Sequence, residues 1–210
     1  MKPLIAVIGG TGKSGKYLVK QLLHEGYHLK LLIRQPDSIQ IQSPLVQIVK
    51  GDARNPEAIL ELLKGSNAVI STLGQPKDET PIFSTATANV LNAMHVYGFR
   101  RYVVTTGVNV DTPFDNKGAA AKFATEWMKT NYTATTADKQ TEYEILSASA
   151  VDWTLVRLPL IEQTDALSEI NVSLEDCPGQ AISAANLTNF LIDQLTDARY
   201  YKNAPFIANK

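Results

Sequence analysis

The chain has 210 residues, 44% of them hydrophobic, which is enough for one sizeable core and predicts one domain over residues 1–210. Charged residues make up 20% and the formal net charge is −1, so the composition offers no surplus of positive charge for a polyanion. We therefore expect a small-molecule partner, and neither nucleic acid nor a membrane surface.

Cys177 is the only cysteine, which excludes an internal disulfide. The chain enters a strand pattern at Leu4 without a secretory leader or a long apolar run, which predicts a cytoplasmic protein; monomer and homodimer both remain open.

Short apolar runs recur along the chain and are separated by helical patterns. The first run, Leu4–Ile8, is a continuous apolar pentad, as expected for a strand that is covered on both faces of a parallel sheet. Further runs predict strands at His28–Ile33, Leu45–Val49, Ala68–Leu73, Arg101–Thr106, Asp152–Arg157 and Pro205–Ala208. Because strands alternate with helices, we expect parallel pairing. The fold class is therefore α/β, a Rossmann-type doubly wound parallel sheet flanked by helices.

Helices are indicated by apolar residues at helical spacing and by signals at their ends. These patterns predict helices from about Ser14 to Glu25, from Asn55-Pro56-Glu57 onward, at Thr85–Tyr97, within Gly118–Ser149 with a break near Asn131, and at Ala185–Leu195. Glycines fit the C-terminal stops of the first and third of these helices, at Gly26 and Gly98. From Pro159 to Gly179 the regular pattern lapses, and we expect an irregular segment there.

A glycine-rich turn, Gly9-Gly10-Thr11-Gly12-Lys13-Ser14-Gly15, follows the first strand directly and opens a helix. In this context Gly9 permits the tight turn, Gly12 lets the backbone approach a pyrophosphate, and Gly15 lets helix and strand pack closely. Free N–H groups and the positive end of the helix then face the phosphates. The turn therefore predicts a dinucleotide site, with cofactor contacts from Gly9, Thr11, Gly12, Lys13, Ser14 and Gly15.

The same turn also resembles a nucleoside triphosphate loop, because Gly12-Lys13-Ser14 matches the end of such a loop. The first glycine of that loop would have to stand at position 7, which is Val7. Without a glycine there the loop cannot wrap the β and γ phosphates. ATP or GTP hydrolysis is therefore rejected.

The end of the second strand predicts which dinucleotide is bound. An acidic residue there would hydrogen-bond the ribose 2′-hydroxyl and repel a 2′-phosphate, but this chain has Arg34. A guanidinium pairs well with a phosphate dianion, so NADP(H) is favoured over NAD(H). A solvated surface position for Arg34 would leave that preference undecided.

Two more segments end strands at the same edge of the sheet. Asp52, with Ala53 after it, follows the third strand, where its carboxylate either accepts from the adenine amino group or serves as a cap or turn residue. Thr72-Leu73-Gly74 ends the fourth strand, where a glycine allows close approach of the sugar and phosphates. We expect both segments to contact the cofactor.

Together these motifs resemble the atypical short-chain dehydrogenase/reductase superfamily, in particular small NAD(P)H-binding proteins similar to flavin reductase/biliverdin-IXβ reductase and NmrA-like proteins. The resemblance rests on Val7–Gly15, Leu32-Ile33-Arg34, Gly51-Asp52-Ala53, Val69–Gly74, Arg101–Gly107, Glu142–Leu146 and Asp152–Pro159. It implies that Thr105 and Thr106 lie beside the nicotinamide and that Pro159 packs over it. It also implies that Lys139 holds the nicotinamide ribose, so Lys139 and Thr106 are the expected catalytic residues.

One departure from the superfamily bears on the chemistry. The Tyr-x-x-x-Lys pair would need a tyrosine at position 135, and the chain has Thr135. That tyrosine protonates a carbonyl oxygen, which makes carbonyl reduction doubtful here. Hydride transfer to a planar conjugated acceptor (a flavin, quinone or tetrapyrrole) demands less of the protein than carbonyl reduction does, because solvent can protonate a delocalised anion. The alternative is a non-catalytic NADP(H) sensor of the NmrA-like type.

Other residue patterns are less informative. The histidines show no ligand spacing with Cys177 or with paired carboxylates, so no metal site is expected. Residues of about 107–117 and 159–180 are expected to form the two walls of the substrate side, although an ordinary surface loop is as good an explanation for the first. Trp127 and Trp153 are expected in the core or at an interface rather than against substrate.

Overall fold

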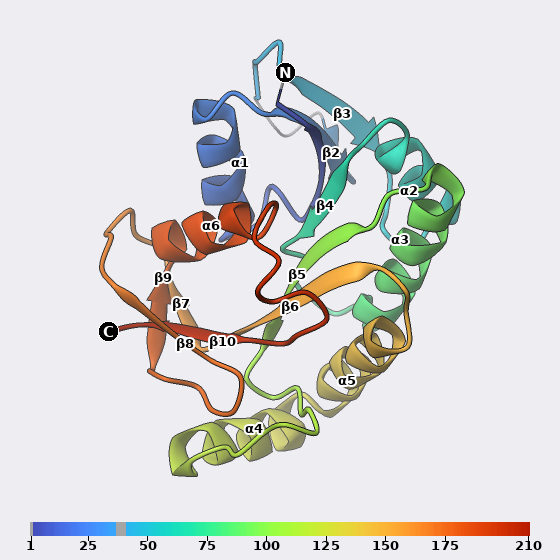
Figure 1. Ribbon diagram of the computed structural model, residues 1–210. Helices are drawn as coiled ribbons and strands as arrows, with labels where there is room; N and C mark the ends of the chain where they lie inside the picture. Colours follow the sequence, from blue (N-terminus) through green and yellow to red (C-terminus); the bar gives the residue numbers. More distant parts are fainter. Residues whose placement is uncertain (1, 37–40) are drawn as a thin grey trace.

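The computed structural model describes residues 2–36 and 41–210. Within them, eight strands form one sheet in the order β3-β2-β1-β4-β5-β6-β10-β8 (Figure 1). The strands are β1 (Leu4–Ile8), β2 (His28–Ile33), β3 (Val46–Lys50), β4 (Ala68–Ser71), β5 (Arg101–Gly107), β6 (Asp152–Leu158), β8 (Ile170–Ser173) and β10 (Phe206–Asn209). All neighbours pair in parallel except β10 with β8. The strand order reverses between β1 and β4, so the predicted doubly wound sheet is confirmed.

Helices cover both faces of this sheet (Figure 1). Their bounds are α1 (Gly15–His24), α2 (Pro56–Leu63), α3 (Phe83–Tyr97), α4 (Ala119–Asn131), α5 (Thr133–Ser147) and α6 (Ala184–Asp193). Side chains alternate between the faces along each strand. In β1, Ile5 and Val7 pack towards α1 and α6, and Ala6 and Ile8 pack towards α2, α3 and α5. Two apolar cores result, one on each face. No helix in the described part of the chain is long and apolar enough to span a membrane.

The predicted elements agree with the structure to within about two residues at most ends. The break near Asn131 is confirmed, since α4 ends there and α5 begins at Thr133. The fourth strand is shorter than predicted, because regular pairing stops at Ser71 and the chain turns towards the cleft.

The segment 159–179 was predicted to be irregular, and in part this is wrong. It contains β8 and a three-residue strand β7 (Leu160–Glu162), which pairs in parallel with β9 (Ala181–Ser183) in a second small sheet. Strands of three or four residues are too short to display an alternating pattern, and the partner of β8, β10, lies far away in the sequence. The sequence therefore carried no local signal for them.

The last residues of β6 are fixed by a buried ion pair. Arg157 is fully buried, and its Nη1 donates to Asp115 Oδ1 at 2.6 Å. Its other nitrogens donate to the carbonyl oxygens of Ala204 (2.8 Å) and Leu174 (3.0 Å), and the guanidinium lies 3.5 Å from the centroid of the Phe206 ring. This one side chain thus joins β6 to β10, to the segment after β8 and to the loop after β5.

We expect Asp115→Asn to destabilise the fold by about 3–5 kcal/mol, because it leaves a buried guanidinium without its counter-charge. Asp165→Asn is the control at an exposed ion pair: the side chain of Asp165 is 73% exposed and lies 3.5 Å from that of Lys20, and we expect a loss of about 1 kcal/mol or less. Urea unfolding measures both free energies. Equal losses would contradict a special role for the buried pair.

Candidate functional site

The turn between β1 and α1 lies directly against the end of β4. Gly9 has φ +79°, and a Cβ added there would meet the Thr72 carbonyl oxygen at 2.6 Å. A Cβ at Gly15 would meet Gly9 O at 2.1 Å. Thr72 Oγ1 donates to Gly9 O at 3.2 Å, and Thr72 N donates to Ile8 O at 2.9 Å. Only glycine allows this approach at positions 9 and 15, which explains two of the four glycines of the turn.

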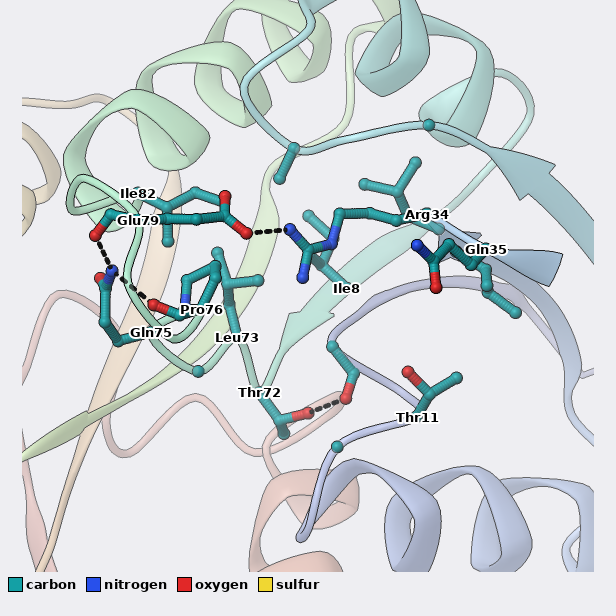
Figure 2. Close-up of a pocket in the computed structure, with 17 residues that line it drawn as sticks. Ile8, Thr11, Arg34, Gln35, Thr72, Leu73, Gln75, Pro76, Glu79 and Ile82 are labelled. Carbon is teal, nitrogen blue, oxygen red and sulfur yellow. Dashed lines mark hydrogen bonds and ion pairs between the residues drawn. The ribbon is translucent and has the colours of Figure 1, made fainter. Parts of the chain in front are cut away.

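A cleft of about 620 Å³ opens beside this turn, at the carboxyl ends of β1, β2 and β4 (Figure 2). It is lined by Ile8, Gly9, Thr11, Gly12, Leu32, Ile33, Arg34, Gln35, Gly51, Ala53, Thr72, Leu73, Gly74, Gln75, Pro76, Glu79 and Ile82. In open α/β sheets this is where ligands bind, at the point where the strand order reverses. Gln75 is one of these lining residues, and its Oε1 is buried and has no hydrogen-bond partner among the described residues.

Charged side chains meet across the cleft (Figure 2). Arg34, at the end of β2, donates to Glu79 Oε1 at 2.8 Å, and Arg54 contacts the other oxygen of the same carboxylate. Arg54 also binds Asp52, with Nε–Oδ1 at 3.0 Å and Nη2–Oδ2 at 2.9 Å. Hydrogen bonds from Arg54 and Arg34 lower the pKa of Glu79, and a hydrogen bond from Arg54 lowers that of Asp52. Both carboxylates are thus ionised at neutral pH.

Several predicted cofactor residues line the cleft, and several do not. Those that line it are Gly9, Thr11, Gly12, Arg34, Ala53, Thr72, Leu73 and Gly74. Lys13, Ser14 and Gly15 belong to the turn but not to the lining. Asp52 is not part of the lining either, and its carboxylate binds Arg54. Pro159 lines a different pocket.

That second pocket, of about 600 Å³, lies at the carboxyl ends of β5 and β6. It is lined by Gly107, Val108, Asn109, Ala120, Ala121, Phe123, Ala124, Trp127, Met128, Leu158, Pro159, Leu160, Cys177, Gly179 and Gln180. None of these lining residues carries a formal charge at neutral pH. Since β4 and β5 are parallel neighbours, both pockets open at the same edge of the sheet.

The two expected catalytic residues lie outside the linings of both pockets. Thr106, on β5, is buried, and its Oγ1 has no hydrogen-bond partner among the described residues. Lys139, on α5, has its Nζ 4.6 Å from the centroid of the Phe83 ring. Burial lowers the pKa of Lys139, and the charge of Glu142 opposes that shift. Burial also raises the pKa of Glu142 to about 7.

The structure adds residues that sequence reasoning missed. Glu79 and Arg54 belong to loops without periodic pattern, and nothing in the sequence places them opposite Arg34. Trp127 was expected in the core or at an interface. It lies outside the core, half exposed, and lines the second pocket, whereas Trp153 is buried as expected. The spacing of Phe123 and Trp127, four residues apart on one face of α4, was a signal that could have been read.

Comparison with known proteins agrees with this geometry. An isoflavone reductase homolog of Nicotiana glauca is 31% identical over 134 residues, which are 59% of this chain and 41% of that protein. The match thus spans about two fifths of the relative's length. A short-chain dehydrogenase/reductase of Veillonella parvula, solved in complex with NADP, superposes with a TM-score of 0.82 at 16% identity, covering 100% of this chain and 95% of that one. The anaerobilin reductase ChuY of Escherichia coli gives 0.79 at 18% identity, covering 99% and 97%.

A family match covers most of the chain. Residues 9–198 match the NAD(P)H-binding protein family, and they include every residue that lines the first cleft except Ile8. The structural neighbours, among them a short-chain dehydrogenase/reductase, share the fold of this chain. The chain belongs to the NAD(P)H-binding family of Rossmann-fold proteins.

Proposed function

We propose that the protein is an NADPH-dependent oxidoreductase that transfers hydride to a planar, conjugated and uncharged acceptor. The observation that carries this proposal is the pairing of a dinucleotide cleft with a separate apolar pocket at the same edge of the sheet. A nicotinamide extending from the first cleft along this edge, past the ends of β4 and β5, would reach the second pocket. The protein's task is then to position two rings against each other.

The cofactor supplies the hydride, and the residues around it bind and orient. The turn 9–15 would hold the pyrophosphate, and Arg34 the adenosine end. By the resemblance to short-chain dehydrogenases/reductases, Thr106 Oγ1, next to the last residue of β5, and Lys139, in the middle of α5, would hydrogen-bond the nicotinamide end. The reduced nicotinamide would supply a hydride, which is one proton with two electrons, and solvent would supply the second proton that completes the two-electron reduction of the acceptor. No protein acid is needed at position 135, which is Thr135.

The lining of the second pocket favours an uncharged acceptor. Phe123 and Trp127 offer aromatic surface for a planar ring. Carboxylates or phosphates on the acceptor would find no cation among the lining residues, and burying them without a partner is costly. A quinone-like or isoalloxazine ring therefore suits the pocket better than a tetrapyrrole with free propionates.

We expect the purified protein to oxidise NADPH with a neutral quinone or riboflavin as acceptor, and to do so at least about tenfold faster, by kcat/KM, than with biliverdin. Trp127→Ala should lower kcat/KM for the neutral acceptor by about tenfold or more through lost ring contact. Tyr97→Ala, which removes an exposed aromatic ring at the last residue of α3, is the control and should leave kcat/KM unchanged. NADPH binding without turnover on any acceptor would reject catalysis and favour the NmrA-like sensor that Thr135 also allows.

Arg34 is proposed to select NADP(H). We expect Arg34→Gln to weaken NADPH binding by about 1–3 kcal/mol through loss of a charge-assisted contact, and to weaken NADH binding by much less. Fluorescence titration with each cofactor measures both dissociation constants. Equal losses of affinity for NADPH and NADH would contradict the proposed contact between Arg34 and the 2′-phosphate.

Substitutions at two glycines of the turn should separate an effect on stability from an effect on cofactor binding. We expect Gly15→Ala to destabilise the fold by about 2 kcal/mol or more, because its Cβ would meet Gly9 O at 2.1 Å. At Gly12 a Cβ meets only Gly9 O, at 3.2 Å, so Gly12→Ala should keep most of the stability but weaken NADPH about tenfold by blocking the pyrophosphate. Thermal unfolding and cofactor titration measure the two effects. Unchanged NADPH affinity in Gly12→Ala would place the pyrophosphate elsewhere.

A further inference from the structure

One carboxylate in the cofactor cleft, that of Glu79, contacts two arginines: Arg34, which lines the cleft, and Arg54, which lies next to the lining residue Ala53. Glu79 comes from the loop between β4 and α3, and its side chain points across the cleft to Arg34 (Figure 2). Arg34 Nη1 lies 2.8 Å from one oxygen, and Arg54 contacts the other. The carboxylate of Glu79 thus accepts from guanidinium N–H groups that are equally suited to donate to a phosphate.

We propose that Glu79 is a further determinant of cofactor selectivity, an internal anion that competes with the 2′-phosphate of NADP(H) for Arg34 and Arg54. The inference rests on the proposed use of Arg34 for that phosphate. NADP(H) must displace the carboxylate in order to bind, whereas NAD(H), which lacks the phosphate, leaves the ion pairs intact. Glu79 therefore narrows the preference for NADP(H) that the arginines create.

Charge balance explains why the phosphate and the carboxylate exclude each other. Arg34 and Arg54 carry two positive charges, and Asp52 and Glu79 carry two negative charges, so the cluster is neutral as it stands. A phosphate dianion added to it would face an uncompensated excess of negative charge. With the Glu79 carboxylate moved away, the two arginines and Asp52 leave one positive charge for the phosphate.

Glu79 rather than Asp52 is the carboxylate that can move away from the two arginines. Asp52 Oδ1 accepts from the main-chain nitrogen of Arg54 at 2.9 Å, in addition to the two side-chain bonds, and so stays with Arg54. The main chain at Glu79 is anchored separately, because Gln75 Nε2 donates to the carbonyl oxygens of Glu79 (2.8 Å) and Pro76 (3.1 Å). The side chain of Glu79 is 34% exposed and can rotate into solvent while the loop keeps its fold.

The test compares Glu79→Gln with the wild-type protein by calorimetric titration of NADPH, NADH and adenosine 2′,5′-bisphosphate. We expect the variant to bind NADPH and the bisphosphate about three- to tenfold more tightly, and NADH within about twofold of the wild type. In an Arg34→Gln background the same change should tighten NADPH by less than about twofold, because the competition needs both partners. Asp78→Asn removes one negative charge from the same loop, where its side chain is 85% exposed, and should leave all three affinities unchanged.

The outcomes separate this inference from the proposed function. Weaker NADH binding in Glu79→Gln, with NADPH unchanged, would overturn the inference and assign the carboxylate to the ribose hydroxyl. Unchanged affinity for every ligand would overturn it too, and leave Glu79 as a surface ion pair. Failure of the wild-type protein to bind NADPH or the bisphosphate would reject the proposed function itself.

Discussion

The close contact between the glycine turn and the end of β4 is the constraint on which the cofactor cleft depends. Main-chain atoms of the turn and of Thr72 approach to distances that leave no room for a side chain at Gly9 or Gly15. This contact sets where α1 begins and therefore where its free N–H groups point. It also brings the ends of β1 and β4 together at the point where the strand order reverses, so that the floor of the cleft is built from backbone.

The sequence predicted the parts of the molecule that depend on local pattern. Apolar runs such as Leu4–Ile8 predicted the six central strands, because each strand is buried on both faces and needs no alternation to be recognised. The glycines of the turn and Arg34 at the end of β2 predicted half of the cleft, since both follow directly from the order of strand, turn and helix. The break between α4 and α5 was also visible near Asn131.

The other half of the site comes from contacts between segments far apart in the chain. Glu79 meets Arg34 across 45 residues, and Arg157 meets Asp115 across 42. No periodicity records such pairs, because they are set by the sheet order and by the paths of two loops. Trp127 illustrates the same point, since its spacing with Phe123 shows that they share a face of α4 but not that this face borders a pocket. Pairing of very short strands, as in β7 and β9, is likewise fixed only by the surrounding fold.

The anchoring of the loop after β5 has a consequence for how the protein's specificity can diverge. Lys117 is buried and donates to the carbonyl oxygens of Val108 (2.8 Å) and Val110 (3.2 Å), and Arg157 holds the same loop through Asp115. Substitutions of Lys117 or Asp115 leave a buried charge unpaired or remove it, and they destabilise the fold whatever the ligand. In the facing wall, the side chain of Leu160 is 70% exposed, and its strand β7 pairs with β9 through three residues. Substitutions of the Leu160 side chain can therefore change ligand preference without loss of the fold, so related chains should differ there first.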